Sequence, residues 1–287
     1  MKNTKKRFKI GIIGHGTVGR AIAAGFSFIA DIKIYDKYYP VDPWEEVAKS
    51  WFIFVCVPTP SKKNGEIDLS IMDEVMEKLS KDAGGIVIIK STVVPGTTRS
   101  YLDKYPEMKI INNPEFLTDR TAMLDFVNPS RILLGGNIRW TNLVEKLYQA
   151  RIPSAPIYKG TSVETELVKY ICNSFFAVKI SFFNEFYRLG EMTPHSYNRI
   201  KEMVLADGRI GNSHMDIPGH DGKHGWGGSC FPKDTKAICK VAERAGTSLK
   251  VIEAAIKSNE EIRELTKRER IGIKDVEALT KKKGKAP

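Results

Sequence analysis

The length and composition of the chain indicate a folded protein with more than one domain. It has 287 residues, of which 42% are hydrophobic and 28% charged, values that are ordinary for a globular protein and argue against disorder. No apolar run approaches the roughly 18 residues that a membrane helix needs, so we expect no membrane partner. The formal net charge of +11 favours polyanionic partners, which are nucleic acid, acidic lipid or phosphorylated small molecules.

The N-terminus and the cysteines favour a reducing, cytoplasmic location. The basic start MKNTKKR is followed by an apolar stretch that is too short for a secretory signal peptide. The cysteines at 56, 172, 230 and 239 form no CxxC pair and have no partnering histidine spacing. Neither a metal site nor a disulfide framework is therefore predicted.

Short apolar segments in the first part of the chain predict the strands of a parallel sheet. Amphipathic segments separate them, as in βαβ units, and the connections are long enough to cross over. We therefore predict an α/β domain of the Rossmann type over residues 1–160. The predicted strands lie at 8–13, 32–35, 51–57, 85–90, 109–112 and 131–135, with a last one near 156–159.

A glycine-rich turn in this domain predicts a dinucleotide site. The first predicted strand runs directly into GHGTVG and then into a helical segment, the context in which this motif binds a pyrophosphate at a helix N-terminus. Without a dinucleotide, such a turn is simply a tight strand-to-helix connection. Asp36, at the end of the second predicted strand, can bind ribose hydroxyls and would repel a 2′-phosphate, so NAD is favoured over NADP. The turn residues expected to contact NAD are Gly14, Gly16, Thr17, Val18 and Gly19.

A change of pattern predicts a helical second domain over residues 161–270, followed by a basic tail at 271–287. Thr161 and Glu164 have the spacing of a capping box, and the helix that follows them is apolar on most of its circumference. Such a helix has to be buried in a domain centre or a subunit interface. The side chains that it has to hide are Phe175, Phe176, Phe182, Phe183 and Phe186.

The end of this domain contains a loop and a further predicted helix. The loop at 207–229 is rich in glycine and histidine, and the helix runs from about Asp234 to Arg270. Between them lies GWGGSCFPKDT, in which glycines precede Cys230 and charged residues follow it. Glycines let a substrate approach the sulfur, and a neighbouring ammonium group stabilises a thiolate. An isolated cysteine is more often inert, and we keep that interpretation for the other three cysteines.

A dinucleotide site and a reactive thiol together suggest a definite chemistry. The sulfur adds to an aldehyde, the cofactor removes hydride from the thiohemiacetal, and water hydrolyses the thioester to an acid.

Taken together, these residues resemble the UDP-glucose/GDP-mannose dehydrogenase family. The resemblance implies a four-electron, NAD-dependent oxidation of a nucleotide-sugar alcohol to a carboxylate, and the order CFPKDTKA resembles members that act on UDP-glucose, the substrate that we expect. Besides the glycine turn and the cysteine loop, blocks that resemble family motifs in the family's order are VCVPTP (55–60), IKSTVVPGTT (89–98), NPEFL (113–117), ELVKYICNSFFAVKISFFNE (166–185) and DGRIG (207–211).

The resemblance implies catalytic roles for individual residues. Cys230 is expected to be the nucleophile, and Asp234 to orient a water. Lys169 and Asn173 lie four apart on a predicted helix, so both point the same way, and a cation with an amide there stabilises a developing oxyanion. The alternative for Lys169 is a surface lysine.

Three further residues resemble family positions near the reacting groups. Thr92 resembles the threonine that holds the catalytic water. Glu115 and Asp119 resemble a carboxylate pair near the thioester and the nicotinamide. The family usually has glutamate at the position of Asp119, whose side chain is shorter.

The other implied contacts divide between cofactor, substrate and a second subunit. Arg209 resembles an arginine that reaches into a neighbouring subunit's substrate site, which implies a homodimer through the helical domain; otherwise it is an ordinary loop arginine. Further cofactor contacts are expected from Val57, Pro58, Thr59, Ser91, Thr92, Asp119 and Lys233. Substrate contacts are expected from Glu115, Phe116, Leu117, Lys169, Asn173, Arg209, Trp226 and Gly227.

The sequence leaves alternatives open. Family members usually continue into a third, nucleotide-gripping domain, so an NAD-binding remnant without turnover is one alternative, and activity on another nucleotide sugar such as GDP-mannose is a second. A nucleic-acid-binding module would use the positive charge, but no DNA- or RNA-binding motif supports it. A plain 2-hydroxyacid dehydrogenase would leave Cys230 unexplained. We therefore expect a nucleotide-sugar substrate and no nucleic-acid partner.

Overall fold

The computed structural model describes residues 7–39, 41–118, 120–190 and 196–264. The chain divides into two compact units, an N-terminal unit of residues 1–169 and a C-terminal unit of residues 170–287. The division falls inside the long helix α7 (Ser162–Gly190), slightly beyond the boundary that the sequence predicts near residue 160.

The N-terminal unit contains, within its described residues, a seven-stranded sheet of order β2-β1-β3-β4-β5-β6-β7. Because β1 lies between β2 and β3, the chain reverses direction across the sheet there, and such a reversal opens a crevice at the carboxyl ends of the two strands after β1 and β3. Every predicted strand is present to within two residues. The strands are β1 (Phe8–Ile13), β2 (Ala30–Tyr35), β3 (Phe52–Val55), β4 (Ile86–Ile89), β5 (Lys109–Asn112), β6 (Ile132–Gly136) and β7 (Ile157–Gly160).

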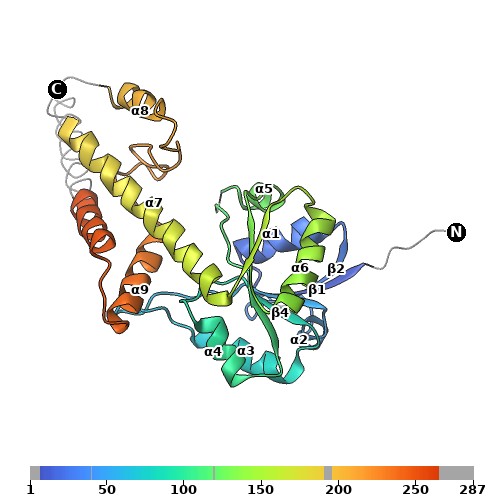
Figure 1. Ribbon diagram of the computed structural model, residues 1–287. Coiled ribbons are helices and arrows are strands. Elements are labelled where there is room, and N and C mark those ends of the chain that lie inside the picture. The colour runs from blue at the N-terminus through green and yellow to red at the C-terminus, as the bar shows by residue number, and fades with distance from the viewer. Residues whose placement is uncertain (1–6, 40, 119, 191–195, 265–287) are drawn as a thin grey trace, which may run out of the picture. The chain divides into compact units, whose positions relative to one another are not determined.

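Helices cover both faces of this sheet (Figure 1). Strand side chains alternate between the faces, as the pleat requires: Ile10 and Ile12 pack in one hydrophobic cluster and Ile13 in the other. The first face carries α1 (Thr17–Phe26), α5 (Ala122–Val127) and α6 (Ile138–Arg151), and the second carries α2 (Trp44–Ala48), α3 (Ser70–Asp82) and α4 (Thr97–Lys104).

The direction of β6 differs from the fully parallel sheet that the sequence predicts. β5 and β6 pair in antiparallel register, with Ile111 opposite Gly136, whereas β6 and β7 are parallel. The reason lies in α5, which packs on α1 instead of crossing the sheet beside β5. The chain therefore returns from the edge at which β5 ended, while the longer α6 makes a true crossover to β7.

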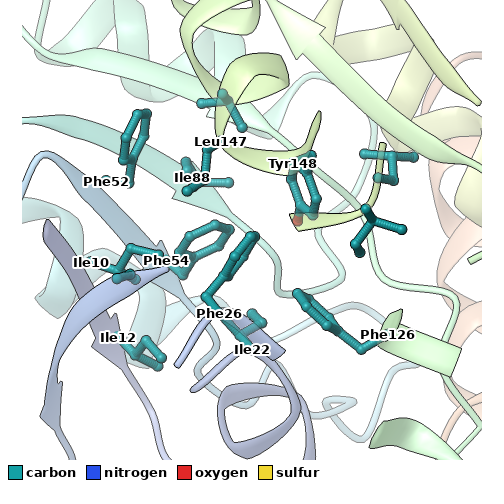
Figure 2. Close-up of a cluster of buried hydrophobic side chains, with 14 of the residues drawn as sticks. Ile10, Ile12, Ile22, Phe26, Phe52, Phe54, Ile88, Phe126, Leu147 and Tyr148 are labelled. Carbon is teal, nitrogen blue, oxygen red and sulfur yellow. The ribbon is translucent and has the colours of Figure 1, made fainter. Parts of the chain in front are cut away.

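Phe26, at the end of α1, lies at the centre of the first cluster (Figure 2). Its side chain is fully buried. Its ring centroid lies 5.9 Å from that of Phe54, 5.2 Å from that of Phe126 and 5.3 Å from that of Tyr148. One side chain therefore joins a strand, α1, α5 and α6.

The described residues of the C-terminal unit form helices and connecting loops. It contains the rest of α7, then α8 (Tyr197–Leu205), α9 (Phe231–Arg244) and a helix over residues 250–264. The single helix predicted from Asp234 to Arg270 is therefore wrong, because Gly246 has a φ of +74° and ends α9. Residues 265–270 and the basic tail at 271–287 lie outside the described residues. Among the described helices, none combines the length and apolar character that crossing a bilayer takes.

The start of α7 is confirmed, and its phenylalanines are only partly buried within the chain, so the predicted alternative of a subunit interface stays a prediction. The Thr161 backbone N–H donates to Glu164 Oε2 at 2.6 Å, and the Glu164 N–H donates to Thr161 Oγ1 at 3.2 Å, which is a capping box. Phe183 is buried, but Phe175, Phe182 and Phe186 are 60%, 51% and 56% exposed. The apolar pattern marks a face that the described residues of this chain do not cover.

Removing the Phe26 side chain tests its central position. We expect Phe26→Ala to lower the free energy of unfolding by about 3–5 kcal/mol, because a fully buried ring leaves a cavity. Phe28→Ala is the matched control, since that side chain is 77% exposed, and a change of less than about 0.5 kcal/mol is expected there. Urea unfolding of both variants measures the difference, and equal effects would contradict this view of the core.

Candidate functional site

The glycine turn after β1 has the shape of a pyrophosphate cradle. Gly14 has a φ of +96°, and a Cβ on it would lie 2.6 Å from the Cys56 carbonyl oxygen. A Cβ on Gly19 would lie 2.0 Å from the Gly14 carbonyl oxygen. Gly16, the N-cap of α1, has open space where a Cβ would stand, and no side chain caps the helix. The turn, with Thr17 and Val18 as the first residues of α1, leaves backbone N–H groups open to an anion.

Asp36 lies directly after β2 and beside this turn. Its carboxylate accepts hydrogen bonds from the backbone N–H groups of His15 (2.8 Å), Tyr38 (2.9 Å) and Tyr39 (3.1 Å). These bonds, led by the one from His15, lower the pKa of Asp36 despite a partial desolvation. An ionised carboxylate therefore stands beside the glycine turn, which fits the ribose hydroxyls of NAD and disfavours a 2′-phosphate.

The predicted cofactor-binding turns after β3 and β4 are bonded to each other. Ser91 Oγ donates to the Val57 carbonyl at 2.7 Å, and Thr59 Oγ1 donates to the Thr92 carbonyl at 2.7 Å. The structure thus brings four of the predicted residues into one layer at the carboxyl edge of the sheet. Pro58, between Val57 and Thr59, is exposed.

The first turns of α7 hold the segments that end β4 and β5. Thr165 Oγ1 donates to Asn112 Oδ1 at 2.8 Å. The buried Glu166 carboxylate accepts from the Gly96 N–H at 2.6 Å, the Thr98 N–H at 2.9 Å and Thr98 Oγ1 at 2.5 Å. Burial raises the pKa of Glu166, and these hydrogen bonds oppose that rise. Glu166 therefore anchors the turn that follows Thr92.

Lys169 is buried and joined to Glu115, so the surface alternative for Lys169 is wrong. Its ammonium group donates to the Glu115 carbonyl at 2.5 Å and lies 3.7 Å from the Glu115 carboxylate. The same ammonium lies 5.2 Å from the ring centroid of Phe116. The Leu117 N–H donates to Glu115 Oε1, so three predicted substrate residues form one turn around Glu115. Asp119 lies outside the described residues.

Lys90, Asn113 and Tyr148 form a buried polar group beneath the Glu115 turn that the sequence analysis did not single out. The Lys90 ammonium donates to Asn113 Oδ1 and to the Pro114 carbonyl, each at 3.3 Å. The hydroxyl of Tyr148 donates to the same Asn113 oxygen at 2.6 Å. Lys90 lies inside the predicted motif at 89–98. Its place directly after a strand of apolar residues only was the feature of the sequence that could have identified it.

Cys230, in the C-terminal unit, is the N-cap of α9 and is exposed. Its sulfur lies 3.7 Å from Ser229 Oγ. The other described cysteines are only partly exposed, and burial raises the pKa of Cys56 to about 12 and that of Cys239 above its usual range. Position and exposure therefore single out Cys230 as the accessible thiol.

Asp234 lies one turn along α9 and binds two other predicted residues. It is 1% exposed. Its carboxylate accepts from Asn173 Nδ2 at 2.6 Å and from the Lys233 ammonium at 2.6 Å. The Lys233 ammonium therefore forms its ion pair with Asp234. Its predicted stabilisation of the Cys230 thiolate stays a prediction.

Two asparagines that the sequence analysis missed hold the glycine loop before Cys230. Asn184 Oδ1 accepts from the Gly225 N–H at 2.9 Å. Asn259 accepts from the Trp226 N–H at 2.7 Å and donates to the Trp226 carbonyl at 2.9 Å. One side chain therefore binds both backbone polar groups of Trp226. Gly225 has a φ of +70°, a conformation that glycine adopts without strain. In the sequence, the signal for Asn184 and Asn259 was a polar residue at a position where the helical pattern expects an apolar one.

Trp226, Gly227 and Arg209 have defined surroundings in the same unit. The Trp226 indole is buried and donates to Ser181 Oγ at 2.9 Å, and a Cβ on Gly227 would lie 2.7 Å from an Arg263 guanidinium nitrogen. Arg209 is exposed and forms two bonds of 2.6 Å with the Asp207 carboxylate. Their contacts with substrate stay predictions. In the described ranges, no group of three or more His, Cys, Asp or Glu side chains is placed to hold a metal ion.

Comparisons with known proteins agree with this arrangement. The model of the UDP-glucose/GDP-mannose dehydrogenase family, NAD binding domain, matches residues 40–152, and the model of the central domain of the same family matches residues 163–261. UDP-glucose 6-dehydrogenase of Rickettsia prowazekii is 37% identical over 215 residues, which cover 72% of this chain and 48% of that protein. UDP-glucose 6-dehydrogenase TuaD of Bacillus subtilis is 33% identical over 227 residues, 76% of this chain and 48% of that protein. The chain thus spans about half the length of the curated relatives that it matches.

Solved structures give the same result. A UDP-glucose dehydrogenase from Pyrobaculum islandicum matches with a TM-score of 0.81 and 29% identity, over 91% of this chain and 70% of that one. A 3-hydroxyisobutyrate dehydrogenase of Mycobacterium tuberculosis has a TM-score of 0.67 at 16% identity, over 87% of this chain and 91% of that one, a likeness of fold alone. With its glycine turn, its ionised Asp36 and both matching domains, the chain belongs to the UDP-glucose/GDP-mannose dehydrogenase family and carries that family's NAD-binding domain.

Proposed function

We propose that the protein oxidises UDP-glucose to UDP-glucuronate with NAD, through a thiohemiacetal and a thioester on Cys230. The observation that carries the proposal is the exposed Cys230 at the start of α9, one turn from the buried Asp234–Asn173 pair. Family membership and the 37% identity to a UDP-glucose 6-dehydrogenase support the choice of substrate.

The reaction balances as two successive two-electron oxidations. The C6 alcohol loses a hydride and a proton to give an aldehyde, and the Cys230 thiol adds to the aldehyde carbon. Loss of a second hydride and of the hydroxyl proton leaves the thioester, and water displaces the thiol to give the carboxylate and a proton. NAD, when bound, accepts each hydride, and a fresh molecule is needed for the second.

The residues of each unit support separate parts of this reaction. In the C-terminal unit, the Asp234 carboxylate is held by Asn173 and Lys233, and we assign it the orientation of a water and the movement of a proton. In the N-terminal unit, Lys169 supplies a buried positive charge beside Glu115. Such a charge stabilises an oxyanion on the substrate, since a preorganised cation in a dry site acts strongly on developing charge.

We further propose that two copies of the chain associate through the exposed face of α7. In the C-terminal unit this face carries large apolar side chains at helical spacing, with the Phe182 and Phe186 ring centroids 4.8 Å apart. A second copy would bury it, as an apolar stripe of this kind requires. Arg209 is then available to the partner's substrate. The exposed residues of the stripe are Ile171, Phe175, Phe182, Phe186 and Leu189.

Replacing the nucleophile tests the thioester route. We expect Cys230→Ser to reduce acid formation from UDP-glucose on the order of a thousandfold or more, with NAD affinity unchanged because the glycine turn is intact. Cys239→Ser, in the same helix, is the matched control and should keep its activity. Mass spectrometry of the product and titration with NAD measure the two quantities.

Two results of that experiment separate the alternatives. Undiminished acid formation by Cys230→Ser would refute the thioester. If the unaltered protein binds NAD but produces no NADH with any UDP- or GDP-sugar, the alternative of an NAD-binding protein without turnover holds.

A charge on the α7 face tests the dimer. Phe182→Glu should shift the solution mass from dimer to monomer, because pairing two copies would bury the introduced carboxylate. Met203→Glu is the control, since Met203 is 67% exposed on α8, outside the stripe. Light scattering after size exclusion gives the masses; a monomeric starting protein, or a dimer that survives Phe182→Glu, contradicts the assignment.

A further inference from the structure

Lys90 is a buried cation to which no role has yet been assigned. It follows β4 directly and is 8% exposed. Its ammonium group donates to two neutral oxygens, Asn113 Oδ1 and the Pro114 carbonyl, each at 3.3 Å. Neutral acceptors repay only part of the cost of taking an ammonium group out of water. A glutamine in its place would supply a donor without that cost.

The two adjacent carbonyls of the Glu115 turn are held by two different lysines. Lys90 reaches the Pro114 carbonyl from β4, and Lys169 reaches the Glu115 carbonyl from α7 at 2.5 Å. Both ammonium groups are buried. The turn that carries the Glu115 carboxylate is therefore fixed from two sides of the N-terminal unit.

The charged and titratable groups around Lys90 explain how it stays protonated. The Glu115 carboxylate favours its charged form and Lys169 opposes it. The Cys56 thiol stays protonated and uncharged near neutral pH, because burial raises its pKa to about 12, and Tyr148 reaches Lys90 only through Asn113. Burial is the strongest influence and lowers the pKa of Lys90 to about 8. Lys90 is thus mostly charged at pH 7 and mostly neutral above about pH 9.

We propose that Lys90 is a positioning residue, whose buried positive charge acts with Lys169 to hold the Pro114–Glu115 backbone and to set the Glu115 carboxylate for the reaction. The inference rests on the oxidation proposed above and adds a dependence on the charge of Lys90. A side chain that merely filled space or donated a hydrogen bond would not show that dependence.

The test compares Lys90→Gln with the unaltered protein across pH 6.5 to 9.5. At pH 7 we expect kcat to fall roughly tenfold to a hundredfold, with KM for NAD unchanged. The ratio of the two kcat values should then fall toward equality as pH rises through about 8, because the native lysine loses its charge. Tyr148→Phe, which removes the other donor to Asn113 without a change of charge, should keep the native pH profile.

Thermal unfolding shows whether the variant is folded and supplies a second readout. Because burial lowers the pKa of Lys90, the charged lysine destabilises the fold at pH 7 and this penalty fades as pH rises toward the unfolded value of 10.5. Lys90→Gln should therefore melt no lower than the native protein at pH 7, and its relative advantage should shrink at pH 9.5. If it does not fold, Lys90→Arg replaces it; its charge persists, so its activity relative to the native protein should rise with pH.

The outcomes distinguish this inference from the proposed function. A native protein that oxidises UDP-glucose, with a kcat ratio that is the same at every pH, overturns the role of Lys90 and leaves the oxidation standing. A native protein that is inactive on every nucleotide sugar removes the proposed function and this inference together.

Discussion

Buried polar side chains on the first turns of α7 fix the carboxyl edge of the sheet. The Glu166 carboxylate accepts hydrogen bonds from backbone N–H groups at the start of α4, and the Lys169 ammonium donates one to the Glu115 carbonyl. Both side chains are almost fully buried, and a buried charge without a partner is strongly destabilising. A shift of α7 by one residue would leave both without partners. The helix register is therefore set by these two charges, and the turns after β4 and β5 are set by the helix.

In the C-terminal unit, both neutral and charged side chains hold the glycine loop: the Arg263 guanidinium donates to the Trp226 carbonyl at 3.0 Å and to the Gly225 carbonyl at 3.4 Å. This glycine loop before Cys230 has few side chains of its own to hold it. Asn184 and Asn259 instead bind its backbone from two helices, and the buried Trp226 anchors it to Ser181. The thiol stays exposed, while the nearby Asp234 is buried and fully engaged. Flexible residues thus acquire a single conformation from rigid neighbours.

Much of the N-terminal unit follows from the sequence because its signals are local. Runs of buried Val, Ile and Phe mark the strands, the glycines mark the turn after β1, and Thr161 with Glu164 marks the start of α7. The direction of β6 is not local, since it depends on where α5 packs. The break after α9 was marked by Gly246, but a helical pattern on both sides concealed it.

The residues of the candidate site also divide into those that the sequence predicts and those that only the structure reveals. Asp36 could be predicted from its place at the end of the second strand, and Lys169 and Asp234 could be predicted because the resemblance fixes their positions. Their partners could not, because a buried Asn259 or Lys90 has no periodic pattern and gains its meaning from a distant residue. The sequence could not decide between a domain centre and a subunit interface for Phe182, because an apolar pattern predicts a covered face without saying which molecule covers it.

The number of NADH molecules formed for each nucleotide sugar consumed tests the central claim most directly. A complete four-electron oxidation at Cys230 predicts two NADH for every UDP-glucose, with UDP-glucuronate as the product. One NADH for each sugar with a carbonyl product, or no NADH from UDP-glucose at all, would contradict the account.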